Sequence, residues 1–184
     1  AEVVADLSGG GTLLLEEIAI AGMAPGAITV GLGSALQEDD PLGGRTLLGH
    51  VERALDQEPF RRPVAQAPVT IVGGVLRLEP LRLGDPARGE ESWSGAAAVD
   101  LASGRLDMRG VMRAAERPSG WTGAPPQIDL GWTGNWEAPR RIVDVGPLTN
   151  GVAQIVLQRE LDRIEAFERE AGERTRRLEQ LRME

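Results

Sequence analysis

Residues 127–136 read Gln-Ile-Asp-Leu-Gly-Trp-Thr-Gly-Asn-Trp, the strictest alternation of apolar and polar side chains in the chain. Ile128, Leu130, Trp132 and Trp136 share one phase, and polar residues occupy the other. Successive side chains of a β-strand point to opposite faces, so this pattern predicts a strand with one apolar and one polar face. We expect both tryptophans to lie on the apolar face and to belong to the core, and the alternative is a contact with a membrane interface or with lipid chains.

The same period of two extends upstream of this stretch. Alternating runs at residues 65–71, 76–83, 97–101 and 106–113 predict further short strands, and residues 12–20 predict a first strand after three glycines. Ala-Ser-Gly at residues 102–104 is typical of a hairpin turn, which predicts antiparallel pairing. Pro80 shifts the phase of its run and therefore indicates a bulge or an edge.

Two short helices are predicted in the N-terminal third. Apolar residues four apart indicate one helix near residues 25–37, and an apolar stripe that ends before Pro59 indicates another near residues 46–58. Thr46 can cap the second helix. The residues therefore predict an α+β, β-rich fold in which an antiparallel sheet is accompanied by helices.

The chain changes character near Pro147, where the strands give way to a charged amphipathic run from Val152 to Glu184. This run predicts a long helix and divides the chain into a β-rich domain at residues 1–147 and a helix at 148–184. Glu168 and Thr175 interrupt the apolar stripe, which argues against a long homodimeric coil. The stripe is the candidate partner-binding surface and consists of Leu157, Leu161, Ile164, Phe167 and Leu178.

Composition excludes several functional classes. The chain has 184 residues, a net charge of −8 and no cysteine, and all 20 of its basic residues are arginine. Its acidity argues against nucleic-acid binding, which needs a basic surface. No run is long and apolar enough to predict a signal peptide or a membrane span.

The sequence contains little that covalent chemistry requires. His50 is the only histidine and lies beside an apolar stripe, so we expect a structural role for it. Without cysteine, a zinc site would have to consist almost wholly of carboxylates, and we expect neither a metal nor a cofactor. Glu16 and Glu17 are neighbours in a predicted strand and must face opposite sides, which a glycosidase pair cannot do. The protein is therefore predicted not to be an enzyme.

Short strands with one apolar face cannot leave that face in water. It must be covered by helices, by a second sheet or by a ligand such as lipid tails. The two predicted helices could plug the sheet themselves, and the alternative function is then a capping or interaction module that docks a partner through its C-terminal helix. The candidate lipid-binding face consists of Leu76, Leu78, Val99, Leu106, Met108, Leu130 and Trp132.

A series of short motifs occurs in a fixed order along nearly all 184 residues. They are LSGGGTL at 7–13, IAGMAPGAI at 20–28, GVLRL at 74–78, GAAAVDL at 95–101, RLDM at 105–108, PQIDL at 126–130, GNWEAP at 134–139 and RIVDVGPLTN at 141–150. This order resembles the C-terminal region of the AsmA family, whose last strands precede a charged helix.

The resemblance implies properties that the residues alone do not. Members of the family are Gram-negative envelope proteins that resemble the bridge-like lipid transfer proteins, in which a curved β-sheet forms a groove for acyl chains. It implies a curved sheet, groove or half-barrel, phospholipid acyl chains as ligands, and a role in phospholipid transport and outer-membrane lipid homeostasis. It also implies a periplasmic location, an inner-membrane anchor helix outside these 184 residues, and an envelope protein as a possible partner.

Overall fold

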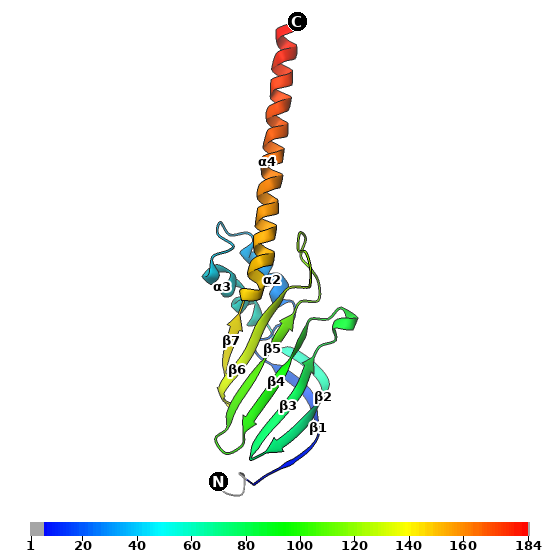
Figure 1. Ribbon diagram of the computed structural model, residues 1–184, viewed down its shortest axis with the longest axis vertical. Coiled ribbons are helices and arrows are strands. Elements are labelled where there is room, and N and C mark those ends of the chain that lie inside the picture. Colours follow the sequence, from blue (N-terminus) through cyan, green and yellow to red (C-terminus); the bar gives the residue numbers. More distant parts are fainter. Residues whose placement is uncertain (1–5, 184) are drawn as a thin grey trace.

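The computed structural model describes residues 6–183 and places them in one β-sheet and a small set of helices (Figure 1). In chain order the elements are β1 (Gly9–Ile20), α2 (Ala27–Ala35), α3 (Gly44–Leu55), β2 (Phe60–Val72), β3 (Val75–Leu83), the 3₁₀ helix η1 (Pro86–Arg88), β4 (Ser92–Asp100), β5 (Arg105–Arg113), β6 (Gln127–Asn135), β7 (Arg140–Asp144) and α4 (Gly146–Met183).

The sheet is an antiparallel meander in which every strand pairs with its neighbour in the chain, in the order β1 to β7. It is curved and remains open, with β1 and β7 at its two edges (Figure 1). The α+β, β-rich fold with two short helices and one long C-terminal helix is thus confirmed. A register shift between Leu78 and Leu81 confirms the bulge expected at Pro80.

The two ends of the sheet differ. The connections between β2 and β3, β4 and β5, and β6 and β7 are short turns at one end, which we call the hairpin end (Figure 1). At the other end lie α2, α3, the base of α4 and the longer connections, and we call this the helix end. The projecting part of α4 points away from the hairpin end.

The core occupies the inner, concave face of the sheet at the helix end. Trp93 is fully buried there, and its indole N–H donates a hydrogen bond of 2.9 Å to the carbonyl of Leu130. The ring lies against Gly95 and Gly110, where a Cβ atom would come within 2.7 and 2.5 Å of it. Both glycines are therefore required by the close approach of the ring to the backbone.

Helices complete this core. Ile28 of α2, Val51 of α3 and Val152 of α4 are fully buried in the same cluster as Trp93. The helices α2 and α3 approach so closely that a Cβ at Gly31 would lie 2.8 Å from the Cα of Val51. The helix end of the sheet is consequently closed by packed side chains.

Polar contacts fasten the helices to the sheet and to one another. Arg141 of β7 pairs with Asp56 at the end of α3 and also donates to the carbonyl of Gly22 at 3.3 Å. Arg159 of α4 donates to the carbonyl of Leu36, at the end of α2, at 2.8 Å. These bonds hold the three helices in place around one end of the sheet.

The structure corrects three local predictions. Helix α3 begins at Gly44 with Gly43 at its N-cap, so Thr46 lies inside the helix and does not cap it. Trp136 follows the end of β6 and is 50% exposed, so it does not belong to the core. The strand β7, which the alternation pattern did not predict, forms the last edge of the sheet.

Candidate functional site

The seven predicted lipid-binding side chains all point to the inner face of the sheet. Strand register arranges them in rows that run across the strands. The row nearest the hairpin end contains Leu76, Val99 and Leu106, because Leu76 pairs with Val99 and Val99 with Leu106. The next row contains Leu78, Met108 and Trp132, with Ala97 between the first two. Leu130 belongs to a third row, which is closer to the helix end.

Burial divides these seven residues into two groups. Leu130 and Trp132 are only 1% and 6% exposed and belong to the closed core, so they are not accessible to a ligand. The other five are only partly buried, although they share the same face. These accessible residues, which we call the open rows, are Leu76, Leu78, Val99, Leu106 and Met108.

Sequence reasoning missed two further residues beside the open rows. Val69 pairs with Leu78, and Ile71 pairs with Leu76, and both are partly buried. Their place on the inner face follows from the alternation of residues 65–71, which predicted the strand but was not extended to the site. The accessible apolar surface therefore spans β2 to β5 at the hairpin end.

The rim of the hairpin end carries a tightly held turn. The carboxylate of Asp100 accepts hydrogen bonds from the backbone N–H groups of Ala102 at 2.9 Å and Ser103 at 3.2 Å. Hydrogen bonds from Ser103 and Ala102 hold the pKa of Asp100 below its ordinary value. Asp100 is thus engaged in shaping the turn between β4 and β5.

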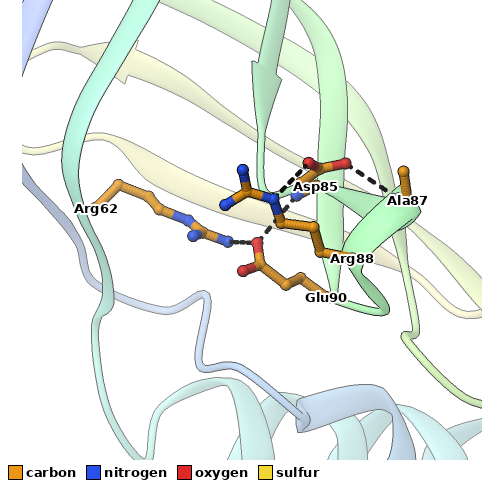
Figure 2. Close-up of polar contacts among 5 residues, drawn as sticks. All are labelled: Arg62, Asp85, Ala87, Arg88 and Glu90. Carbon is orange, nitrogen blue, oxygen red and sulfur yellow. Dashed lines mark hydrogen bonds and ion pairs between the residues drawn. The ribbon is translucent and has the colours of Figure 1, made fainter.

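A second concave region lies at the helix end, where an open pocket of about 530 Å³ is bordered by the start of α2 and the connections next to it. Figure 2 shows the polar cluster beside it, in which Arg62 of β2 pairs with Glu90. Glu90 also accepts from the backbone N–H of Asp85 at 3.1 Å. The hydrogen bond from Arg62, then that from Asp85, lowers the pKa of Glu90.

The same cluster stabilises the turn that contains η1. Asp85 accepts from the backbone N–H of Ala87 at 3.0 Å and pairs with Arg88, whose Nε lies 3.3 Å from its carboxylate (Figure 2). Glu90 and Asp85 therefore connect the turn between β3 and β4 to β2. Although Nε of Arg62 is buried without a hydrogen-bond partner among the described residues, the paired groups form a structural brace.

Glu91 differs from its neighbour because it is buried. Its Oε2 accepts from the backbone N–H of Gly26 at the N-terminus of α2, whereas its Oε1 is buried without a hydrogen-bond partner among the described residues. Burial raises the pKa of Glu91 from its ordinary 4.5 to about 7, against the opposing effect of hydrogen bonds from Gly26 and Ile28. From its position just before β4, the carboxyl group caps the N-terminus of α2.

His50 is engaged in local contacts on α3. Its Nε2 lies 3.0 Å from a carboxylate oxygen of Glu38, and its Nδ1 lies 3.0 Å from Nη2 of Arg53. Since the arginine can only donate, Nδ1 accepts and Nε2–H donates to Glu38. Nε2 thus ties α3 to the segment that follows α2, and Nδ1 is engaged within α3.

Within residues 6–183, no three His, Cys, Asp or Glu side chains lie close enough together to hold a metal ion. In the same part of the chain, no helix combines the length and the apolar character needed to cross a membrane.

The second candidate surface is the apolar stripe of α4. The helix base belongs to the core, where Leu148 and Val152 are fully buried and Ile155 is 4% exposed. Beyond Val156 the side chains are exposed, Arg159 still bonds to the carbonyl of Leu36, and the rest of the helix projects away from the body (Figure 1). The five predicted partner-binding residues lie on this projecting part, with 46–72% of each exposed: Leu157, Leu161, Ile164, Phe167 and Leu178.

Comparison with known proteins finds no matching family model, no matching curated protein and no matching solved structure.

Proposed function

We propose that this protein binds acyl chains of phospholipid on the inner face of its sheet, at the hairpin end, as a non-enzymatic module of envelope lipid transport. The observation that carries the proposal is the gradient of burial along one continuous apolar face. Trp93, near the helix end, is fully buried, whereas Leu76 and Leu106, near the hairpin end, keep part of their surface in contact with solvent.

The chemistry of the open rows suits an aliphatic ligand. They are lined by the side chains of Leu, Val and Met, and a flexible thioether such as that of Met108 adapts to chains of varied shape. Their immediate neighbours along the strands, Arg77 and Asp107, point to the outer face and are exposed. An acyl chain placed on the inner face would therefore contact apolar atoms without displacing charged groups from water.

The helices also support this assignment of the site to one end only. Because α2, α3 and the base of α4 cover the buried part of the inner face, the open rows are the part of that face that these helices leave accessible. This arrangement combines the two alternatives that the sequence left open, since the helices plug part of the face and leave the open rows accessible. The proposal agrees with the function that the resemblance to the AsmA family implies.

The test is native mass spectrometry of the purified protein, with lipid extraction from the same preparation and titration with a fluorescently labelled phospholipid. We expect co-purified phospholipid, and we expect Leu76→Asp to reduce binding of the labelled lipid by roughly tenfold or more, because a carboxylate on the inner face must lose its hydration when the chain binds. The matched control is Val72→Asp, since Val72 points to the outer face and is 65% exposed.

Circular dichroism and the thermal midpoint establish that both variants fold. A wild-type protein that carries no lipid and does not bind the labelled phospholipid would overturn the proposal. Equal loss of binding in the two variants would also overturn it, since the inner face would then have no special role.

A further inference from the structure

We propose that the projecting part of α4 pairs with the same segment of a second copy of this chain, as a short antiparallel two-helix coil. The inference concerns a different surface from the lipid site and does not depend on it. It starts from an exposed stripe on the projecting part of α4, where Leu157, Phe167 and Leu178 each expose more than 60% of their surface. The bond from Arg159 to the carbonyl of Leu36 ties this part of the helix to the body but does not involve the stripe.

The spacing of the stripe is that of a coiled-coil seam. Leu157, Ile164, Ala171 and Leu178 recur every seven residues, which places an apolar residue at each d position of four successive heptads. The a positions alternate with them and are occupied by Leu161, Glu168, Thr175 and Arg182. A partner in the same orientation would place each polar a residue opposite its own copy, with Glu168 facing Glu168.

An antiparallel partner removes this conflict, because a residues then pack beside d residues of the other helix. In the register that brings Leu161 beside Leu178 of the second copy, Ile164 lies beside Thr175 and Glu168 lies beside Ala171. Because the two identical helices are related by a twofold axis, each of these layers occurs twice in the coil. The two residues that interrupt the stripe are therefore each matched to an apolar d residue, and the two leucine layers lie one layer in from each end of the overlap.

Charge complementarity selects the same orientation. Residues 157–173 carry three arginines and six acidic residues, for a net charge of −3, whereas residues 174–184 carry four arginines and two glutamates, for a net charge of +2. In the antiparallel register above, residues 157–165 (net charge −1) lie beside residues 174–182 (net charge +3) of the other copy, and residues 166–173 (net charge −2) lie beside their own copy. A parallel pair instead places all three segments beside their own copies, the +3 segment included. The charge pattern thus identifies a second copy of this helix as a fitting partner.

Helix length is also compatible with this register. The overlap from residue 157 to residue 182 is about 39 Å long at 1.5 Å per residue. In this register Leu157 lies beside Arg182 of the second copy, so the overlap ends where each helix enters its own body. The two bodies then lie at opposite ends of the coil and do not compete for space.

The first experiment measures the mass of the full chain by sedimentation over a concentration series. We expect a monomer–dimer equilibrium in the wild type and a dissociation constant raised by roughly tenfold or more in Leu161→Asp, since that change places a carboxylate in both leucine layers. The matched control is Ala166→Asp, which adds the same charge on the opposite side of the helix and should leave the mass distribution unchanged.

Cysteine cross-linking tests the orientation, and the chain is suited to it because it has no cysteine of its own. We expect Ile164→Cys and Thr175→Cys chains to form a disulfide with each other when mixed and oxidised, and each to remain uncross-linked alone. In the antiparallel register, two copies of residue 175 lie about 16 Å apart along the axis, which is too far for a disulfide.

Three results would overturn the proposal. The first is a wild-type chain that stays monomeric throughout the concentration series. The second is an equal effect of Leu161→Asp and Ala166→Asp on dimerisation. The third is self-cross-linking of Thr175→Cys in preference to the mixed pair, which would show a parallel arrangement.

Discussion

At the scale of single residues, the most consequential side chain outside the open rows is Glu91. Its buried carboxyl group caps the N-terminus of α2 and has one oxygen without a hydrogen-bond partner among the described residues. Removal from water disfavours the charged form, and the hydrogen bonds from α2 compensate only in part. The junction between α2 and β4 is therefore sensitive to pH.

The direction in which stability changes with pH follows from the raised pKa of Glu91. The pKa of Glu91 is about 7 in the folded protein and close to 4.5 in the unfolded chain, so unfolding releases a proton between these values. Stability from this group should decrease as pH rises from about 4.5 to 7, by about 2–4 kcal/mol in total. Glu91→Gln should flatten that decrease, as measured by urea unfolding at a series of pH values.

The control for this experiment is the behaviour of two carboxyl groups whose pKa values are lowered and not raised. The lowered pKa values of Glu90 and Asp100 act below pH 4.5, where stability should fall as these carboxylates are protonated. Glu91→Gln should leave the fall in stability below pH 4.5 unchanged. A variant whose pH profile equals that of the wild type between pH 4.5 and 7 would show that Glu91 is not the group responsible.

At the scale of elements, α4 is one helix with two environments. Its first turns are packed in the core, and the rest is exposed to solvent. Amphipathic spacing predicted the helix well, because the pattern persists over many turns. It could not predict that the base belongs to the body, since burial of Leu148 and Val152 depends on contacts with residues distant in the chain.

Two leucines in α4 allow this division to be measured. Leu148→Ala should lower the free energy of unfolding by about 2–5 kcal/mol, because a fully buried leucine leaves a cavity. Leu157→Ala should change it by less than about 0.5 kcal/mol in the monomer, because Leu157 is 61% exposed. Chemical denaturation at low protein concentration checks both values, and similar losses in the two variants would contradict the division.

The sheet was predicted with uneven success for a physical reason. Alternation predicted the strands from β2 to β6, and the predicted first strand corresponds to β1, because each has an apolar inner face over several residues. It missed β7, which is only five residues long and presents Arg141 as well as Val143 to the inner side. It also placed Trp136 in the core, although the strand ends one residue earlier.

The candidate site could be predicted only as a face. Period-two spacing correctly placed Leu76, Leu106 and Leu130 on the same side, since side-chain direction is a local property. It could not separate the accessible Leu76 from the buried Leu130, because that distinction depends on where the helices pack. Spacing alone also left open whether the helices plug the whole face or part of it.

At the scale of the whole molecule, the two proposed surfaces lie at opposite ends of the body (Figure 1). The open rows lie at the hairpin end, and α4 projects from the helix end with the packed core between them. We therefore expect lipid binding and self-association to be independent. Sites this far apart, with no shared contacts, generally contribute additively.

This independence can be measured with variants already described. Leu161→Asp should reduce the dimer fraction and leave the amount of phospholipid bound per chain unchanged, and Leu76→Asp should do the reverse. Native mass spectrometry reports both quantities in the same spectrum. Loss of lipid from monomeric Leu161→Asp would contradict the expectation and would indicate that the two ends are coupled.

The meander topology also has a consequence for folding kinetics. From β2 to β7 each strand is joined to the next by 2–13 residues, whereas 39 residues separate β1 from β2. Short loops close at a low entropic cost, so the six-stranded portion is expected to assemble rapidly from successive hairpins. The strand β1 together with α2 and α3 then joins last, and the transition state for folding should have little structure in the N-terminal third of the chain.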